Sequence, residues 1–219
     1  MSIDAQDFID RIRTVTGPSE RIGLHEPDIS DVEHQYVQEC LSSTFVSSVG
    51  AFVSRFEQEI AAYTGSKYAV AVSNGTSALH VSLLLAGVQE GDEFLIPALS
   101  FVATANAVVH AGGVPHFVDS DEQTMGMSVS ALIVPMHTLG HPLEIKEIVE
   151  LANEYGIPVV EDSAESLGSF IGDQHTGTFG TLGILSFNGN KTITTGGGGM
   201  ILTDDESLAH KAKHLTTTA

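Results

Sequence analysis

The chain of 219 residues contains no tryptophan, one cysteine and few basic side chains. With Cys40 as its only cysteine it cannot form an intramolecular disulfide, which fits a reducing compartment such as the cytoplasm. Nine Lys and Arg residues against 28 Asp and Glu give a formal net charge of −19. Such a charge repels phosphate backbones and anionic lipid headgroups, so we expect neither nucleic acid nor a membrane surface as a partner.

Long apolar runs are also missing. The longest stretches, such as Val81–Val88, are far shorter than the ~20 residues that cross a bilayer. Residues 1–20 show no basic segment followed by an apolar one, so the sequence indicates no secretory signal. We therefore expect a cytoplasmic protein, and we predict no metal site.

The composition, with 42% hydrophobic residues, is that of a globular protein. Residues 1–30 are polar apart from a short helical stretch at Phe8–Arg13, and we predict that they form an N-terminal arm. Residues 31–219 are predicted to form one large domain, which begins with a helix, a loop and a second helix up to residue 63. That second helix carries its apolar residues on one face, with Phe52, Phe56, Ile60 and Tyr63 at helical spacing.

From Lys67 onward, short apolar runs alternate with helical segments, which is typical of βαβ units. The predicted strands are Tyr68–Val72, Glu93–Ala98, Pro115–Asp119, Leu132–Met136, Pro158–Asp162, Ile184–Phe187 and Met200–Thr203. The predicted helices are Thr76–Ala86, Ala103–Ala111 and Pro142–Tyr155, the last followed by Gly156 as a C-terminal cap. The fold class is therefore α/β: a three-layer α/β/α sandwich around a mostly parallel sheet.

One connection is too short for this pattern. Only Ser120–Ala131 separates the third and fourth predicted strands, and this stretch is a poor helix former. A parallel crossover needs a dozen or more residues and usually a helix. Either these two strands are not parallel neighbours or a segment is absent here, and we expect the stretch to be poorly ordered or to leave a gap in the helical layer.

Three segments carry candidate chemistry, each with a plainer alternative. Ser73–Leu79 joins a strand to a helix, and the free amides there, with the Thr76 and Ser77 hydroxyls, can hold a phosphate or simply cap the helix. A strand ends at Asp162, which can bind a metal or a cationic nitrogen, or cap the next segment. Lys191 lies in a loop of small and polar residues, where a lysine is usually a solvated surface residue.

The order of these three segments favours pyridoxal phosphate. Its phosphate needs a helix start, its ring nitrogen needs an anion that keeps it protonated, and its aldehyde needs an amine. A nicotinamide-binding Rossmann domain is disfavoured, because no G-x-G-x-x-G joins the first strand to its helix and Gly196–Gly199 follows the last loop instead.

The chain is similar to the DegT/DnrJ/StrS family of nucleotide-sugar aminotransferases, which use pyridoxal 5'-phosphate and have the type I fold. The resemblance runs from about Gly23 to the last residue. The segments that carry it are Ser73–Leu79, Pro97–Asn106 (PALSFVATAN), Val134–Pro142 (VPMHTLGHP), Val159–Ser169 (VVEDSAESLGS) and Leu185–Met200 (LSFNGNKTITTGGGGM).

The resemblance implies a set of site residues. Lys191 is the Schiff-base lysine and moves the substrate proton, Asp162 pairs with the ring nitrogen, and Phe101 stacks on the ring. The phosphate site consists of Gly75, Thr76 and Ser186, beside Ser77 and Asn188. Glu165 stands near the ring hydroxyl where many relatives have Gln, and it needs a hydrogen-bond donor or an altered pKa there. His137 and His141 either touch ligand or are structural.

The resemblance also implies transfer of an amino group from glutamate to a nucleotide-linked keto sugar by a homodimer. Within the family, Glu165 and Asn188–Asn190 are most similar to the branch that acts on UDP-linked 4-keto-6-deoxy-N-acetylhexosamines. Members continue into a smaller C-terminal domain, which this chain is expected to lack. A catalytically incomplete remnant that binds cofactor or a partner is therefore an alternative. A family dehydratase, which replaces the Schiff-base lysine, is disfavoured by Lys191.

Overall fold

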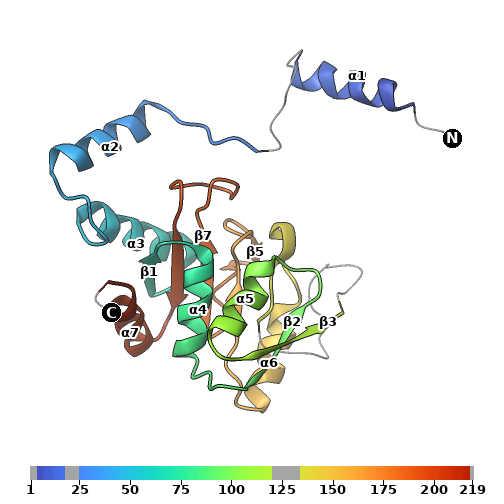
Figure 1. Ribbon diagram of the computed structural model, residues 1–219, viewed down its shortest axis with the longest axis vertical. Helices are drawn as coiled ribbons and strands as arrows, with labels where there is room; N and C mark the ends of the chain where they lie inside the picture. The colour runs from blue at the N-terminus through green and yellow to red at the C-terminus, as the bar shows by residue number, and fades with distance from the viewer. Residues whose placement is uncertain (1–3, 18–24, 120–133, 218–219) are drawn as a thin grey trace.

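The computed structural model describes residues 4–17, 25–119 and 134–217. Helix α1 (Ala5–Thr16) lies away from the body of the molecule, and α2 (Asp31–Ser42) projects from it but contacts α3 (Ala51–Thr64) through Tyr36 and Phe52 (Figure 1). The predicted helical stretch in the arm is α1. Neither α1 nor α2 contains a buried residue, although the sequence assigned α2 to the domain.

A mixed sheet forms the centre of the domain. Its first part has the order β1-β8-β7-β4, in which β8 is antiparallel to both neighbours and β7 is parallel to β4. Residues 134–136 continue the sheet, with a parallel bridge from Met136 to Asp162 and a hydrogen bond from Val134 N to Leu95 O of β2. The last pair, β2 and β3, is parallel. The strands are β1 (Tyr68–Val72), β2 (Glu93–Pro97), β3 (Val114–Val118), β4 (Val160–Asp162), β7 (Leu182–Ser186) and β8 (Gly199–Thr203).

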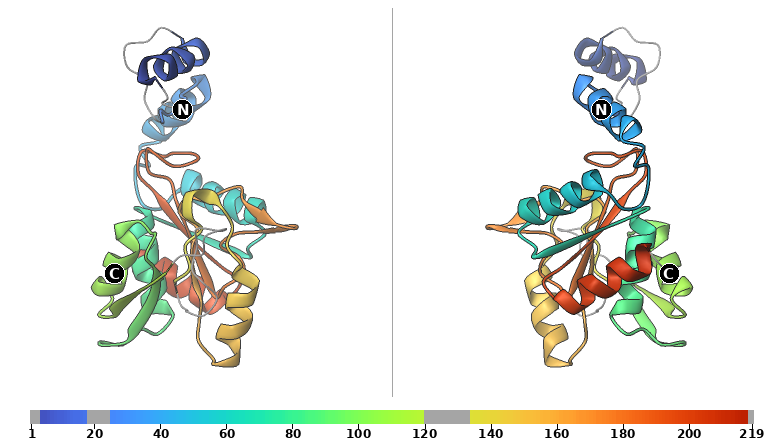
Figure 2. Two further views of the ribbon diagram at one scale, coloured as in Figure 1. Left: turned by 90° about the vertical axis from the view of Figure 1, so that its right-hand side faces the viewer. Right: turned by 90° about the vertical axis from the view of Figure 1, so that its left-hand side faces the viewer.

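Helices cover both faces of this sheet (Figure 2). On one face, α4 (Gly75–Leu85), α5 (Val102–His110) and α7 (Glu206–Thr217) enclose a core that includes Leu79 and Ile201. On the other face, α3 packs on Leu202, and α6 (Ile145–Glu154) packs on Val159. Ile201 and Leu202 are neighbours that face opposite layers, as alternation along a strand requires. The predicted three-layer α/β/α sandwich is confirmed.

The element ends differ from the prediction for local reasons. The strand predicted from Pro158 begins at Val160, and Pro158 itself has no amide hydrogen to donate to a sheet. The helix predicted from Pro142 begins at Ile145 and ends at Glu154, followed by Gly156 with φ 65°, the predicted capping glycine. The sequence did not indicate the short hairpin of β5 (Phe170–Ile171) and β6 (Gln174–His175).

The short connection after β3 has a topological explanation. Leu95 of β2 accepts from Val134 on one side, whereas β3 pairs along the other side of β2. The third and fourth predicted strands are therefore separated by β2 and are not neighbours. The prediction for Ser120–Ala131 itself lies outside the described residues.

Candidate active site

The start of α4 is open toward the end of β7. Asn74 caps this helix by accepting from Ser77 N at 2.8 Å, while the amides of Gly75 and Thr76 belong to the first turn, which has no intrahelical acceptors for them. A Cβ added to Gly75 would lie 2.9 Å from the Cβ of Ser186. This close approach brings the Ser186 hydroxyl beside two free amides, which is the geometry of an anion site.

Asp162 lies at the carboxyl end of β4 and is almost completely buried. Its Oδ2 accepts from Thr104 Oγ1 at 2.7 Å, and its Oδ1 accepts from Ala164 N at 3.2 Å. Burial raises the pKa of the Asp162 carboxyl, while the two hydrogen bonds and the charge of Lys191 act in the opposite direction. A cation beside this carboxylate would offset its desolvation.

Lys191 and Glu165 form a partly buried ion pair, with 3.3 Å between Nζ and Oε1. The other carboxylate oxygen of Glu165 accepts from Leu139 N at 2.8 Å. Lys191 Nζ also lies 5.7 Å from the centre of the Phe101 ring. The donor that Glu165 was expected to need is thus supplied by the Leu139 amide and the Lys191 amine.

A cavity of about 210 Å³ connects these groups. Most of the predicted site residues line it, namely Gly75, Thr76, Phe101, Asp162, Ser186, Asn188 and Lys191. Glu165 reaches the site through its contact with Lys191. Ser77 does not line the cavity, because its amide is bonded to Asn74 and its hydroxyl accepts from Ser73 Oγ at 3.2 Å.

A larger cavity of about 410 Å³ lies elsewhere, between α2, α3 and Gly197–Gly199. Its walls are mainly apolar, and it contains none of the predicted site residues. We regard the smaller cavity as the candidate active site, because it joins an amine, a buried carboxylate and a helix start.

Two groups that shape this site were not predicted from the sequence. Thr104 is fully buried and donates to Asp162, and it lies in the PALSFVATAN segment, where its position on the inner face of α5 was the available signal. The Leu139 amide points at Glu165 because Leu139 has the left-handed φ of 54°. Nothing in the local sequence indicates that conformation for a leucine.

Glu161 points away from the cavity. Its carboxylate accepts from the amides of Gly177, Phe179 and Gly180 and contacts His137 Nε2. Two carboxylates that are adjacent in sequence therefore serve opposite sides of β4, as strand alternation predicts.

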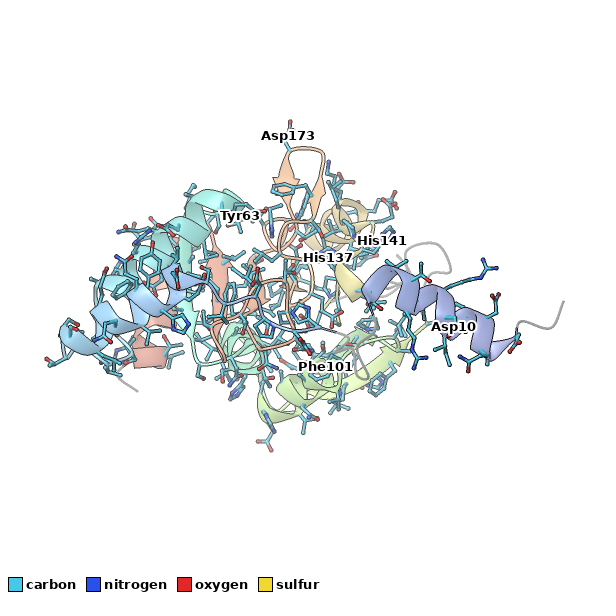
Figure 3. The ribbon with its side chains drawn as sticks, turned by 90° about the horizontal axis from the view of Figure 1, so that it is seen from above. Asp10, Tyr63, Phe101, His137, His141 and Asp173 are labelled. Atoms are coloured by element: carbon cyan, nitrogen blue, oxygen red, sulfur yellow. The ribbon has the colours of Figure 1, made fainter. Side chains whose placement is uncertain are left out.

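Neither histidine of the predicted VPMHTLGHP segment lines the cavity. His137 is buried inside the molecule, whereas His141 is exposed (Figure 3). Of the two predicted alternatives for His137, contact with a ligand or a structural role, its burial fits the structural role. Among the described residues, no group of three or more His, Cys, Asp or Glu side chains is placed to hold a metal ion. In the same ranges no helix combines the length and hydropathy that a membrane span requires.

This fold is that of the type I aminotransferases. Residues 27–219 match the DegT/DnrJ/EryC1/StrS aminotransferase family, and the chain belongs to that family.

Named relatives align with most of this chain. GDP-perosamine synthase of Escherichia coli O157:H7 is 43% identical over 203 residues, which are 88% of this chain and 56% of that protein. The X-ray structure of an aminotransferase from Psychrobacter cryohalolentis superimposes with a TM-score of 0.82 at 35% identity, covering 85% of this chain and 50% of that one. The structure of the E. coli GDP-4-keto-6-deoxy-D-mannose-3-dehydratase with bound hydrated PLP superimposes with a TM-score of 0.81 at 30% identity. The match covers 87% of this chain and 53% of that one. The chain thus spans about half the length of these relatives.

Proposed function

We propose that this chain binds pyridoxal 5'-phosphate through Lys191 and is the cofactor-binding part of an enzyme that moves an amino group from glutamate to a nucleotide-linked keto sugar. The observation that carries this proposal is the single cavity in which Lys191, Asp162 and the start of α4 meet.

The residues present fit the cofactor. The amides of Gly75 and Thr76 with the Ser186 hydroxyl provide donors for a phosphate, and Ser186 lies so close to position 75 that only a glycine fits there. Buried Asp162 supplies the anion for a protonated ring nitrogen, and such a cation would counteract the raised pKa of that carboxyl. The negative charge of the whole chain does not oppose this, because the phosphate donors are local dipoles.

When bound, pyridoxal phosphate supplies an electron sink for the α-carbon of an amino acid. Asp162 and the exposed Phe101, which both line the cavity, would hold that ring. Lys191 would provide the amine that attaches the cofactor, and its Nζ would serve as the base for the α-proton. Glu165, bonded to Leu139, keeps that amine beside the ring position.

For the nucleotide of the substrate, different observations favour two candidates. Glu165 and Asn188–Asn190 are similar to the residues at these motif positions in the branch that uses UDP-linked 4-keto-6-deoxy-N-acetylhexosamines. The relatives with 43% and 30% identity are named for GDP-linked sugars. We favour a GDP-linked keto sugar, because 43% identity over 88% of the chain outweighs a few residues of one loop.

The test is reconstitution of the chain with pyridoxal phosphate, followed by addition of glutamate and then of GDP- or UDP-linked keto sugars. Glutamate should convert the visible absorbance of the lysine-bound cofactor to that of its amine form in a single turnover. A matching keto sugar should restore the first band. Cofactor binding without any response to glutamate would instead support the remnant that binds but does not turn over.

A dehydratase is the second candidate, since one solved relative has that activity in its name. The dehydratases of this family are expected to lack the Schiff-base lysine, and Lys191 lies in the cavity here. Release of water from a 3-hydroxy keto sugar, without net amination, would favour this candidate.

Gly75→Ala is expected to weaken cofactor binding about tenfold or more. The added methyl group would meet Ser186 at 2.9 Å and push the helix start away from the phosphate. Loss of one charge-assisted hydrogen bond corresponds to about 1.5–3 kcal/mol. Absorbance titration gives the Kd, and pyridoxal without its phosphate is the control ligand. If both ligands lost affinity equally, the phosphate would not bind at this helix.

We also propose a homodimer, as the family resemblance implies. Val32, Val37 and Leu41 of α2 are more than half exposed, which leaves apolar surface for association. Light scattering with bound cofactor should give twice the chain mass at micromolar concentration. A monomer at high concentration would contradict this.

A further inference from the structure

A buried carboxylate on the far side of β4 has no role in the proposed site. Glu161 is completely buried. Its Oε1 accepts from Phe179 N and Gly180 N, both at 2.6 Å, and its Oε2 accepts from Gly177 N at 2.8 Å and meets His137 Nε2 at 3.1 Å. Three of these partners are backbone amides, which can only donate, so both carboxylate oxygens of Glu161 act as acceptors.

The partners of His137 define its tautomer. Its Nδ1 accepts from Leu143 N at 3.4 Å, while its Nε2 faces the Glu161 carboxylate. The neutral ring with hydrogen on Nε2 satisfies both contacts, whereas an imidazolium would point an N–H at the Leu143 amide. His137 is therefore held at both ring nitrogens.

His137 begins the turn that reaches the active site. Its amide donates to Asp162 O at 3.1 Å, and its carbonyl accepts from Gly140 N at 3.1 Å. Between them, Leu139 adopts φ 54° and ψ 23°, a conformation that is unfavourable for a residue with a side chain. The Leu139 side chain is 76% exposed, so packing does not impose this conformation. The flanking hydrogen bonds must hold it, including Ser169 Oγ to Gly140 O at 2.7 Å.

Two hydrogen bonds, both to Glu165, connect this turn to the reactive amine. Leu139 N donates to Glu165 Oε2 at 2.8 Å, and Glu165 Oε1 lies 3.3 Å from Lys191 Nζ. A shift of the turn would move the Glu165 carboxylate, and with it the amine.

We infer that His137 and Glu161 are positioning residues for Lys191, acting through the Leu139 amide and Glu165. The inference rests on the proposed function only for the role of Lys191 as the reactive amine. Neither residue touches the cavity, so their effect is on geometry and not on contact with a ligand.

The primary test measures hydrogen exchange of the Leu139 amide in the cofactor-free chain. His137→Leu removes the donor to Glu161 and should accelerate this exchange about fivefold or more, the factor expected for losing one buried hydrogen bond. His137→Gln keeps an N–H near the Nε2 position and should restore slow exchange. Glu165→Ala removes the acceptor and is the positive control.

His80→Leu is the control for loss of a histidine. His80 lies on α4 with its ring against that of His110, and no hydrogen bond among the described residues joins it to the turn at 137–140. It should leave the Leu139 exchange unchanged. Should His137→Leu fail to fold, Glu161→Gln serves as the disruptive variant, because it turns one acceptor oxygen into a donor.

The second readout is the rate at which pyridoxal phosphate attaches to Lys191. His137→Leu should slow attachment about fivefold or more in the parent chain, but in a Glu165→Ala background it should slow attachment no further, because His137 acts through Glu165. Unchanged Leu139 exchange in folded His137→Leu, or additive rate losses, would overturn the inference. If the parent chain attached no cofactor, the proposed function would fail, while the exchange result would still decide the positioning role.

Discussion

Replacing Lys191 with alanine is expected to abolish covalent attachment of pyridoxal phosphate and the visible absorbance that accompanies it. Lys191 lies in the cavity beside Asp162 and Phe101, with its amine held by Glu165. Lys191→Arg should fail equally, because a guanidinium keeps the charge but is not a nucleophile at neutral pH. Loss of the base for the α-proton alone corresponds to a rate decrease of about 10²- to 10⁴-fold.

Borohydride reduction followed by peptide mass spectrometry locates the attachment. Lys67→Ala is the matched control, since Lys67 is exposed at the start of β1 and does not line the cavity. Attachment should be lost in Lys191→Ala and retained in Lys67→Ala. Stoichiometric attachment to another lysine in the parent chain would refute the assignment of Lys191.

Replacing Asp162 with asparagine should leave the shape of the site intact but slow the half-reaction with glutamate by several tenfold steps. Each tenfold step is about 1.4 kcal/mol of transition-state stabilisation. Asparagine has no charge with which to keep a ring nitrogen protonated, whereas the Asp162 carboxylate is the buried anion that lines the cavity. Single-turnover absorbance measures the effect. If Glu161→Gln stopped this half-reaction and Asp162→Asn did not, the wrong carboxylate would have been chosen.

The same substitution should stabilise the cofactor-free chain at neutral pH. Burial raises the folded-state pKa of Asp162 above its ordinary value of 3.8. The folded state then binds the proton more tightly than the unfolded state, so the free energy of unfolding falls as pH rises through that window. Asp162→Asn removes this loss, so the unfolding temperature of the variant should be higher than that of the parent chain at pH 7. The difference should vanish below pH 3.8.

Thr104→Val, in contrast, is expected to lower the stability of the cofactor-free chain. It removes the 2.7 Å donor to Asp162 and leaves the carboxylate buried, at a cost of about 1.5–3 kcal/mol for a hydrogen bond to a charged group. Thermal unfolding of the cofactor-free variants against pH measures both changes. Equal unfolding temperatures for Asp162→Asn and the parent chain at pH 7 would mean that the buried charge is already fully compensated.

The sequence by itself determined the α/β class and the main groups of the site. Alternating apolar runs and helical segments define the strands, and Gly75, Asp162 and Lys191 all follow or end a strand. Ligands in such sheets bind beyond the carboxyl ends of the strands, so their convergence was predictable from strand direction. The opposite orientations of Glu161 and Asp162 followed from alternation alone.

Tertiary structure decided what depends on distances between remote segments. Thr104 and Asp162 are 58 residues apart, and Leu139 and Glu165 are 26 apart, so no local pattern predicts either hydrogen bond. Ser77 was assigned to the site from its place at a helix start, but the Asn74 cap takes its amide and the cavity opens toward Gly75 and Thr76. Periodicity reports which face of an element is apolar, whereas the partner of each polar atom is set by how the layers pack.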